Sequence, residues 1–422
     1  MKILVLGSGA REHAIIQALI RTGSQSQDVI CAPGNAGIAS NVDCFSLNIT
    51  DPELVSKFSL EHSVDLVVIG PEAPLVAGVS DALRESGIAV FGPSQEAAQL
   101  EGSKSFAKKV MSAAGVPTGM AKECSTLDEL KLALNSFSAP YVVKADGLAA
   151  GKGVIVTSDK DAALAHGEGF LNQGMDLLVE EFLDGEEVSL FFLSDGTSVV
   201  PLSPAQDFKR AFDNDEGPNT GGMGAYSPLT WLPEGFVKEV TETVALPTIR
   251  EMSRIGMPFI GLLYCGLIVT KRGIRVIEFN ARFGDPETQV VLRRLLTPLA
   301  PLLHNAATGQ LAGVLEPEFS DDVAVTVVLA SEGYPVTSAP ERPITGISEA
   351  LEDEHIEIAH AATKQTDNGL VATGGRVLSV IAMNKTFHKA RKHVYEAIKK
   401  IHLEGSHYRS DIALKVDEGD ND

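Results

Sequence analysis

Short apolar runs alternate with helix-like stretches through the first hundred residues, and this alternation constrains the fold more tightly than any other feature of the sequence. The runs are rich in Val, Ile and Leu and cover residues 2–6, 29–32, 65–69 and 89–91. The stretches between them have helical spacing and cover residues 12–21, 52–62 and 76–86. Strands that are separated by single helices pair in parallel and are covered by helices on both faces. The sequence therefore predicts an N-terminal doubly wound parallel sheet.

The rest of the chain follows a different pattern, after a helical link that ends at Gly115-Val116-Pro117. From residue 118 to about 189 the order is strand, helix, two strands joined by the glycine-rich stretch 147–153, helix and strand. Long apolar strands and a helix at 233–255 then indicate a largely antiparallel sheet, and the final part is strand-rich with a helix at 386–401. We therefore expect a multidomain α/β and α+β protein with segments 1–102, 103–120, 121–189, 190–322 and 323–422.

Charge and composition exclude several classes of protein. Lys and Arg number 35 against 56 Asp and Glu, a formal net charge of −21, whereas nucleic-acid binding requires a basic face. No apolar run reaches the roughly 18 residues of a membrane-spanning helix, and the opening strand is too short for a signal sequence. We therefore expect no nucleic-acid or membrane partner and a cytoplasmic location. The four cysteines and ten histidines show no C-x-x-C, H-x-x-H or H-E-x-x-H spacing, which argues against disulfides and histidine-based metal sites.

A glycine turn follows the first strand, at the position of a dinucleotide-binding fingerprint. Its sequence is Gly7-Ser8-Gly9-Ala10-Arg11-Glu12, so Glu12 replaces the third glycine, and no acid ends the second strand. Both departures argue against a dehydrogenase. The remaining feature is a backbone turn at a helix N-terminus beside Arg11, which suits a single phosphate. A purely structural turn is the alternative.

A second glycine-rich stretch, Gly147–Gly153, differs from a Walker A loop. Three residues instead of four precede the Gly151-Lys152 pair, Gly153 replaces the Ser or Thr, and a strand follows. A β-hairpin lid whose N–H groups cover nucleotide phosphates explains this stretch better. Lys144 lies three residues before the loop and Lys104 lies upstream. A lone lysine is more often a solvated surface charge, but its position beside the loop favours a phosphate role for Lys144.

The strand at 275–279 leads into a group of polar side chains. Glu278 and Asn280 are two residues apart and therefore share one face of the strand, with Arg282 one step further. A carboxylate and an amide carbonyl are oxygen ligands suited to Mg²⁺, and an arginine beside them could stabilise a transferring phosphoryl group or an acyl phosphate. A half-exposed polar strand face is the alternative.

Two loop regions complete the set of candidate stretches. Residues 179–187 run from an apolar strand into an acidic turn, where backbone groups could read an adenine edge and a carboxylate could hold ribose; a solvated acidic turn is the alternative. Residues 217–226 contain four glycines, which predicts a mobile loop that acts as an anion cradle or lid. Just before it lie Asp207, Lys209 and Arg210. An ordinary surface loop is the alternative here.

Taken together, these stretches resemble the phosphoribosylamine–glycine ligases (glycinamide ribonucleotide synthetases) of the ATP-grasp superfamily. The two most specific runs are GPNTGGMGAYSP (217–228) and IEFNARFGDPETQ (277–289). The other matching runs are GSGAREHA (7–14), APGNAG (32–37), GPEAPL (70–75), QLEGSK (99–104), VKADGLAAGKGV (143–154), EEFLDGEE (180–187), GGRV (374–377) and RSDI (409–412). The resemblance therefore covers nearly the whole chain and leaves no further domain for a second activity.

The resemblance implies an N-terminal substrate domain (1–102), a helical linker (103–120), a small ATP-grasp lobe (121–189), a central lobe with a metal site (190–322) and a C-terminal domain (323–422). It implies ligation of glycine to 5-phosphoribosylamine in purine synthesis, through a glycyl phosphate, with ATP becoming ADP and phosphate. Attack of a carboxylate on the γ-phosphate brings like charges together, so Mg²⁺ or Mn²⁺ and cationic side chains are required. Glycyl phosphate hydrolyses in water, so a closing lid is required. The implied partners are small molecules, with the chain a monomer or weak homodimer.

The resemblance also implies a role for each matching side chain. The nucleotide phosphates would be held by Lys104, Lys144, Gly147, Gly151, Lys152 and Gly153. Adenine would contact the segment from Glu180 to Phe182 and Leu183, and ribose would contact Glu187. The metal would be ligated by Glu278 and Asn280, and catalysis would involve Arg282, Lys144 and Asp207. Phosphoribosylamine would be bound by Gly9, Arg11, Glu12, Asn35 and Glu72, and glycine would lie near Asp207, Asn219, Thr220 and Gly221.

Some positions depart from the family pattern, and two other functions compete. Phe208 stands where the family commonly has His, Ser8 stands in a turn that is usually Gly-Asn-Gly-Gly, and the strand 262–270 carries no acid. One alternative is another ATP-grasp carboxylate–amine ligase or a biotin-dependent carboxylase subunit, against which the APGNAG and GPEAPL runs argue. The other is a catalytically inactive nucleotide-binding regulator, against which the presence of Lys144, Glu278, Asn280 and Arg282 argues.

Overall fold

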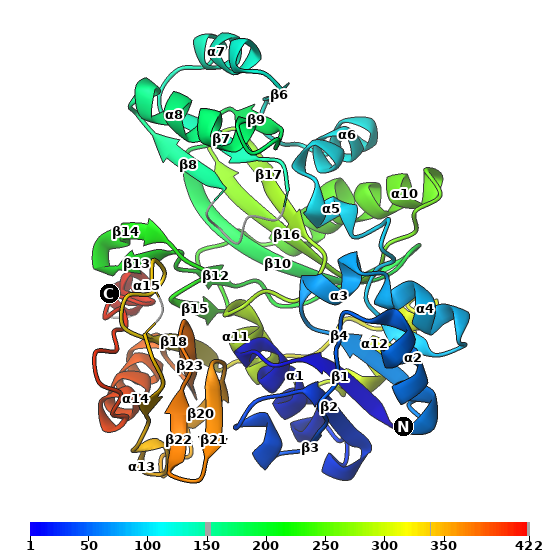
Figure 1. Ribbon diagram of the computed structural model, residues 1–422, viewed down its shortest axis with the longest axis vertical. Helices are drawn as coiled ribbons and strands as arrows, with labels where there is room; N and C mark the ends of the chain where they lie inside the picture. Colours follow the sequence, from blue (N-terminus) through cyan, green and yellow to red (C-terminus); the bar gives the residue numbers. More distant parts are fainter. Residues whose placement is uncertain (148–152, 338, 420–422) are drawn as a thin grey trace.

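The computed structural model describes residues 1–147, 153–337 and 339–419, and Figure 1 shows how its parts are arranged. The first sheet is parallel throughout, in the order β3-β2-β1-β4-β5. Its strands are β1 (Ile3–Gly7), β2 (Val29–Pro33), β3 (Asp43–Cys44), β4 (Leu66–Ile69) and β5 (Ala89–Phe91). The accompanying helices are α1 (Ala10–Arg21), α2 (Pro52–Glu61), α3 (Glu72–Val76) and α4 (Val79–Glu85), with 3₁₀ turns at Ser26–Asp28 and Ile38–Ser40. Every residue of β1 is buried, as expected for a strand covered on both faces. The predicted doubly wound sheet is confirmed.

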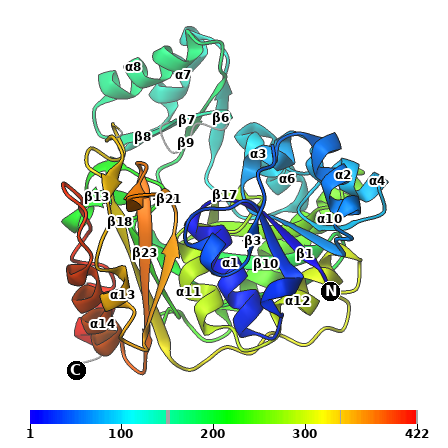
Figure 2. The same cartoon turned by 60° about the horizontal axis from the view of Figure 1, so that its bottom comes forward.

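Two linking helices lead into a small lobe with its own antiparallel sheet, ordered β6-β9-β7-β8. The linking helices are α5 (Gln99–Gly102) and α6 (Lys104–Ala114). The lobe contains β6 (Ala121–Cys124), α7 (Leu127–Ser136), β7 (Tyr141–Ala145), β8 (Val154–Thr157), α8 (Lys160–Leu171) and β9 (Leu177–Glu180). Its order of elements is the predicted one. Figure 2 shows this lobe, with α7 and α8, projecting away from the rest of the molecule.

The central antiparallel sheet has the order β11-β10-β16-β17. Its strands are β10 (Gly185–Asp195), β11 (Val199–Pro201), β16 (Ile260–Thr270) and β17 (Gly273–Asn280). The helix predicted at 233–255 is interrupted: α9 (Phe236–Val240) and α10 (Leu246–Arg254) are joined by a π-helical turn at Thr241–Ala245. Pro247, at the start of α10, has no N–H to donate to the preceding turn. This missing donor accounts for the π-helical turn. The helices α11 (Glu287–Arg294) and α12 (Leu299–Ala307) complete this part.

A five-stranded sheet joins the central lobe to the C-terminal segment, in the order β12-β15-β18-β23-β20. Its strands are β12 (Gln206–Asp207), β15 (Gly224–Ser227), β18 (Val323–Ala330), β20 (Ile356–His360) and β23 (Arg376–Asn384). A small sheet pairs β13 (Arg210–Phe212) with β14 (Glu216–Asn219), and a 3₁₀ turn at Asp213–Asp215 joins these two strands. Another small sheet pairs β22 (Gly369–Ala372) with β19 (Arg342–Pro343) and β21 (Thr363–Thr366). The remaining helices are α13 (Ile347–Ala350), α14 (Phe387–Lys400) and α15 (Leu414–Gly419). Main-chain hydrogen bonds therefore cross the predicted boundary between residues 322 and 323.

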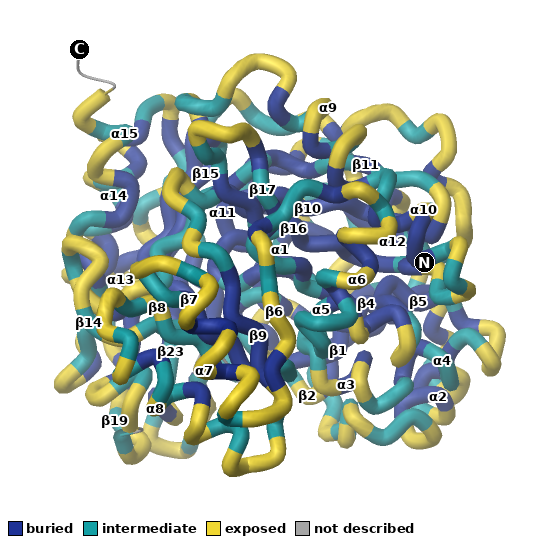
Figure 3. Tube along the Cα trace, turned by 90° about the horizontal axis from the view of Figure 1, so that it is seen from above, coloured by how far each residue is buried: buried dark blue, intermediate teal, exposed yellow. Residues whose placement is uncertain are grey.

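The small lobe has an apolar core of its own, separate from the cores of the rest of the molecule. Two large clusters each combine residues of the N-terminal sheet, the central sheet and the C-terminal segment. A third cluster is confined to the small lobe and runs from Cys124 to Val179. Figure 3 shows buried chain along the central strands and exposed loops around the rim. In the described part of the chain, no helix is long and apolar enough to cross a membrane.

Candidate functional site

A cavity of about 1650 Å³ lies where the small lobe, the central sheet and the N-terminal domain meet. Residues from all three parts, and from the C-terminal segment, form its wall. The predicted site residues that line it are Arg11, Glu72, Lys104, Lys144, Gly147, Gly153, Glu180, Phe182, Leu183, Glu187, Asp207, Asn219, Thr220, Gly221, Glu278, Asn280 and Arg282. Gly9, Glu12 and Asn35 are not among the lining residues, and Gly151 and Lys152 lie outside the described residues.

Three lysines and one carboxylate form the end of the cavity beneath the small lobe. Lys144 on β7 and Lys108 on α6 both contact Glu180, with Nζ–Oε2 distances of 3.0 and 3.4 Å. Lys104 Nζ donates to the carbonyl oxygen of Gly147, 3.0 Å away. Burial acts to lower the pKa of Lys144, but Glu180 and other carboxylates outweigh it and raise the pKa. Burial lowers the pKa of both Lys104 and Lys108. This end of the cavity is therefore cationic and suits an anionic ligand.

The segment between β9 and β10 forms the hinge side of the cavity. Phe182, 40% exposed, and Leu183 both line it, while the carboxylate of Glu180 is committed to the two lysines. The acidic turn expected to extend to residue 187 ends earlier, because β10 begins at Gly185. Glu187 consequently lies on a strand paired with β16, and its carboxylate is 2.5 Å from Lys209 Nζ. The pairing of β10 with β16 therefore directs the Glu187 side chain into the cavity.

Glu278 and Asn280 lie on β17 and face the cavity, as their spacing predicts. Gly266 pairs with Glu278 across the sheet. A Cβ there would lie 3.3 Å from Glu278 Cγ, so a larger residue would press against the Glu278 side chain. Burial acts to raise the pKa of Glu278, but Lys209 and the other nearby cations outweigh it and lower the pKa. Within the described residues, neither side chain makes a hydrogen bond or an ion pair. Two oxygen donors, one of them ionised, are thus free for a hard cation.

Arg282 lies just beyond β17, between two acids of other elements. Its guanidinium is 3.0 Å from Glu101 on α5 and 3.7 Å from Glu72 on α3. Glu101 is nearly buried, and burial raises its pKa despite Arg282. Its other oxygen accepts the N–H of Ala281 at 2.7 Å. The arginine is therefore positioned by carboxylates on the linker and on the N-terminal domain, at the junction of the lobes.

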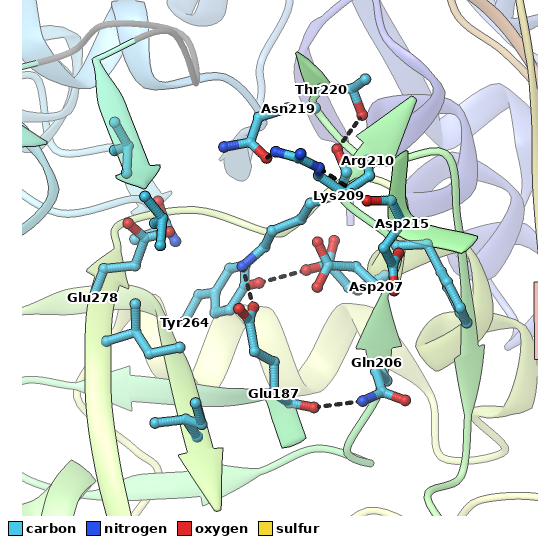
Figure 4. Close-up of a pocket in the computed structure, with 18 of the residues that line it drawn as sticks. Glu187, Gln206, Asp207, Lys209, Arg210, Asp215, Asn219, Thr220, Tyr264 and Glu278 are labelled. Atoms are coloured by element: carbon cyan, nitrogen blue, oxygen red, sulfur yellow. Dashed lines mark hydrogen bonds and ion pairs between the residues drawn. The ribbon is translucent and has the colours of Figure 1, made fainter. Parts of the chain in front are cut away.

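A buried acid network lies beneath Asp207, which is on β12 (Figure 4). Tyr264 Oη donates to Glu287 at 2.5 Å, and Ser189 Oγ donates to the same carboxylate at 3.0 Å. Burial, together with Glu287, raises the pKa of Asp207 to about 7, and Lys209 opposes this rise. Asp207 is therefore a carboxyl group that can gain or lose a proton near neutral pH.

The glycine-rich stretch 217–226 is more ordered than expected. Much of it forms β14 and β15, so the prediction of a mobile loop over its whole length is wrong. The Thr220 hydroxyl donates to the carbonyl of Lys209 at 2.9 Å. The Gly221 N–H donates to Tyr334 Oη at 2.9 Å, and Arg376 Nη1 donates to the Gly221 carbonyl at 2.7 Å. Contacts from the C-terminal segment, which sequence periodicity does not report, hold this loop against the cavity.

The N-terminal glycine turn is closed by its own carboxylate. Glu12 accepts the N–H of Gly9 and the Nε–H of Arg11, both at 2.6 Å. Arg11 also donates to the carbonyl of Phe283 at 3.2 Å and lines the cavity. Asn35 donates to the carbonyls of Ser8 and His360 at 2.8 and 2.7 Å. In this arrangement Gly9, Glu12 and Asn35 shape the turn, while Arg11 and the nearby Glu72 reach the cavity.

Several cavity residues received no role from the sequence, among them Glu101, Lys108, Tyr264 and Glu287. Lys108 lies one helical turn after Lys104, so the shared face of α6 was a usable signal. Glu101 and Glu287 lie inside the matched runs 99–104 and 277–289. Tyr264 had no local signal, since an apolar strand position gives no sign of an acidic partner. Phe208 stands where the family commonly has His, and the guanidinium of Arg409 lies 5.0 Å from the centroid of its ring.

A small antiparallel lobe above an antiparallel sheet, with lysines on one side and Glu278, Asn280 and Arg282 on the other, defines an ATP-grasp fold. Three family models match the chain: "Phosphoribosylglycinamide synthetase, N domain" at 1–101, the ATP-grasp (A) domain at 102–288 and the C domain at 324–415. The chain therefore belongs to the phosphoribosylglycinamide synthetase family.

Relatives and solved structures agree with this membership. A phosphoribosylamine–glycine ligase of Leifsonia xyli is 62% identical over 419 residues, covering 99% of this chain and 100% of the relative. One from Streptomyces coelicolor is 56% identical over 421 residues, covering 99% of both chains. The crystal structure of a phosphoribosylamine–glycine ligase from Thermotoga maritima matches with a TM-score of 0.84 at 33% identity, covering 97% of this chain and 100% of that one. The biotin carboxylase domain of a Hydrogenobacter thermophilus carboxylase, at 17% identity and a TM-score of 0.72, shares the fold alone.

Proposed function

We propose that this chain joins glycine to 5-phosphoribosylamine in de novo purine biosynthesis, converting ATP to ADP and phosphate and forming glycinamide ribonucleotide. The observation that carries the proposal is the single cavity walled by the N-terminal domain, the small lobe and the central sheet. Such a cavity brings a phosphorylated amine, a nucleotide and an amino acid within reach of one another. The relatives of the chain that are named phosphoribosylamine–glycine ligase and match it over its full length support this function over that of another ATP-grasp ligase or an inactive regulator.

The nucleotide would lie between the small lobe and the central sheet. Lys144 and Lys104, with the Gly147 and Gly153 ends of the loop, would hold its phosphates, because the cationic end of the cavity lies there. Adenine would contact the hinge at Phe182 and Leu183. Glu187, on the first residues of β10, would hold the ribose hydroxyls, exchanging its contact with Lys209 for them.

Magnesium or manganese would be held by Glu278 and Asn280. Both offer oxygen atoms without other partners among the described residues, and the lowered pKa of Glu278 keeps its carboxylate charged. This donor set fits a hard divalent cation that takes its other ligands from phosphate and water. When bound, the ion neutralises charge on the transferring phosphoryl group.

The chain's own residues supply positioning and charge for two steps. The glycine carboxylate attacks the γ-phosphorus, the bond to ADP breaks, and Arg282 meets the charge on the resulting glycyl phosphate. The ribosylamine nitrogen then attacks the glycyl carbonyl, phosphate leaves, and the amine gives up a proton. Asp207, whose pKa of about 7 lies near the working pH, suits the acceptor of that proton. Asn219, Thr220 and Gly221 would border the glycine.

Phosphoribosylamine would approach from the N-terminal domain. Arg11 would bind its phosphate and Glu72 its ribose, since both reach the cavity from that side. Gly9, Glu12 and Asn35 would act by keeping the turn in shape. We also propose a cytoplasmic location and a monomer or weak homodimer.

The test is an assay of ADP release with ATP and glycine, with and without phosphoribosylamine generated in the cuvette. Release that depends on both substrates, with formation of glycinamide ribonucleotide, is the expected result. Release with glycine alone that is unchanged by phosphoribosylamine would contradict the proposal, and absence of release under all conditions would favour the inactive regulator.

A further inference from the structure

Two histidines and an aspartate converge at the surface of the C-terminal segment, away from the cavity. Asp353 and His355 lie in the turn before β20, and His393 lies on α14. His355 Nδ1 is 3.0 Å from Asp353 Oδ1, and His393 Nδ1 is 2.5 Å from Asp353 Oδ2. The three donor atoms all lie within 4.8 Å of one another, and none of these residues lines the cavity. The proposed reaction therefore leaves this cluster without a role.

The backbone holds the cluster in its arrangement. Asp353 Oδ1 accepts the His355 N–H at 3.0 Å, and the Asp353 carbonyl accepts the Ile356 N–H at 2.9 Å. The His355 carbonyl accepts the Met383 N–H from β23 at 3.2 Å. The two imidazole rings are stacked, with centroids 4.3 Å apart and planes inclined by 25°. Because the turn is fixed to the sheet, both rings present Nδ1 to the same carboxylate without a change in the main chain.

We propose that Asp353, His355 and His393 bind a divalent transition-metal ion of the Zn²⁺ class. Imidazole nitrogen and carboxylate oxygen favour Zn²⁺, Co²⁺ or Ni²⁺ over Mg²⁺ and Ca²⁺, which prefer oxygen alone. Zinc bonds of about 2.0–2.1 Å require tetrahedral ligands roughly 3.3 Å apart. The two Asp353–imidazole separations of 3.0 and 2.5 Å would open toward this value when the ion binds. Three protein ligands leave the fourth position to water.

Such an ion would join the turn at 353–355 to α14, two elements that are distant in sequence. Since the ion binds only where the fold brings these ligands together, its binding stabilises the folded chain. The competing account is that Asp353 only forms hydrogen bonds with the two imidazoles. That pairing agrees with the low pKa of Asp353, which these hydrogen bonds hold near 2 against the effect of burial. The two accounts differ in whether a transition metal is taken up.

The test uses the full chain freed of transition metals, with excess Mg²⁺ added to fill the proposed site at Glu278 and Asn280. Titration with Co²⁺ should produce the strong visible absorption of tetrahedral cobalt at a single equivalent, and Zn²⁺ should displace it. His355→Gln and His393→Gln should each weaken Co²⁺ binding by more than the roughly 10- to 100-fold that loss of a supporting contact costs. His388→Gln is the matched control, because His388 lies on the same helix and also contacts one aspartate, Asp417, at 3.2 Å; its affinity should equal that of the wild type.

A second measurement does not depend on the variants folding. Zn²⁺ should protect both His355 and His393 of the wild-type chain from diethylpyrocarbonate, as read by mass spectrometry, and should leave His388 reactive. Absence of the cobalt absorption, equal affinity in both glutamine variants and the wild type, or modification of His355 and His393 that Zn²⁺ does not slow would each overturn the proposal.

Discussion

Glu278 is the residue on which the assignment of the catalytic metal depends. Its carboxylate is ionised because Lys209, Lys144 and Lys104 outweigh the effect of burial on its pKa. Glu278→Gln keeps the shape of the side chain and removes the charge, so we expect turnover to fall severely and the Mg²⁺ requirement to rise while the fold persists. Turnover measured over a Mg²⁺ titration checks this, with Glu186→Gln, an exposed acid of the same cavity wall, as control. Near-normal activity at ordinary Mg²⁺ would remove Glu278 from the metal site.

Arg282 should act on the transition state, because the charge that it meets develops during phosphoryl transfer. Arg282→Ala should lower kcat by about a hundredfold or more, as for loss of one preorganised donor, with little change in ATP affinity. The structure adds a second effect, since the nearly buried Glu101 loses its partner; breaking such a pair costs about 3–5 kcal/mol.

The two effects of Arg282→Ala can be separated by a double variant. Glu101→Gln with Arg282→Met removes both charges, so it should recover stability in urea unfolding but not kcat. A collapse of ATP affinity with normal kcat would instead make Arg282 a clamp for the bound nucleotide.

His13 makes stability depend on pH in a direction that its hydrogen bonds determine. Its Nδ1 accepts the His360 N–H at 2.9 Å, while Nε2 lies 2.7 Å from Asn41 Oδ1, so the folded chain requires neutral His13. Burial lowers the pKa of His13 to about 3. In the unfolded chain His13 binds a proton below about pH 6.5. The stability that neutral His13 contributes is therefore full above that pH and is lost as the pH falls toward about 3.

The expected loss is up to about 1.4 kcal/mol per pH unit for this one histidine. The free energy of unfolding from urea titrations at pH 7, 6 and 5 should fall less steeply in His13→Gln than in the wild type. Other groups, such as Asp207, change the stability in the opposite sense, but their effects are the same in His13→Gln and the wild type and cancel when the two slopes are compared. Equal slopes would show that His13 is protonated in the folded chain.

At the level of elements, the loop between β14 and β15 depends on one glycine. Gly222 has a φ of +110°, and a Cβ there would lie 2.4 Å from Pro286 Cδ. Gly222→Ala should therefore cost backbone strain of about 1–3 kcal/mol plus displacement of the loop. We expect a raised KM for glycine and a lower urea midpoint.

Gly369 offers a matched control for this loop. It has the same φ of +110° with no atom near its Cβ position, so Gly369→Ala carries the backbone strain alone. Equal losses of stability in the two variants, with an unchanged KM for glycine in both, would show that the contact with Pro286 does not position the loop.

The central strands explain why the site residues converge. β10 pairs with β16, and β16 pairs with β17, along most of their lengths, so Glu187 and Glu278 face the same cavity from strands that lie two positions apart in the sheet. A bulge between Gly266 and Leu267 shifts this pairing near Glu278. Bulges re-aim side chains beside functional sites, and the register of the sheet therefore decides which side chains face the proposed metal site.

At the scale of the whole molecule, the separate core of the small lobe is the main division. The N-terminal domain, by contrast, shares its core with the rest, and polar contacts such as Arg11 to Phe283 reinforce it. Lys144 therefore belongs to a unit with its own core, while Arg11, Glu278 and Arg282 belong to the larger unit.

Arg11→Ala should raise the KM for phosphoribosylamine while leaving those for ATP and glycine nearly unchanged, since one arginine at a helix N-terminus suits a monophosphate. Steady-state kinetics with each substrate varied in turn checks this. Arg21→Ala is the control, because Arg21 also ties the N-terminal domain to the rest, through the Leu292 carbonyl at 2.6 Å, without lining the cavity. A fall in ATP affinity in Arg11→Ala would make the glycine turn the nucleotide site.

Sequence alone determined the features that depend on local pattern. Apolar period and helix signals predicted β1, β2, β4, β5 and the element order of the small lobe, because burial on both faces and helix capping act over neighbouring residues. Short motifs identified many of the polar residues that line the cavity for the same reason: Glu278, Asn280 and Arg282 follow one another at a spacing of two residues.

Tertiary structure decided what depends on contacts between distant segments. The pairing of Lys108 and Lys144 with Glu180, the ordering of the loop at Gly221 by Tyr334 and Arg376, and the commitment of Glu12 to its own turn follow from packing that no local period reports. Asp353 and His393 lie 40 residues apart in the sequence, so spacing rules missed a cluster that the fold assembles. The sequence specifies the chemistry of each side chain, but the distances between side chains of distant segments are fixed only when the sheets and helices pack.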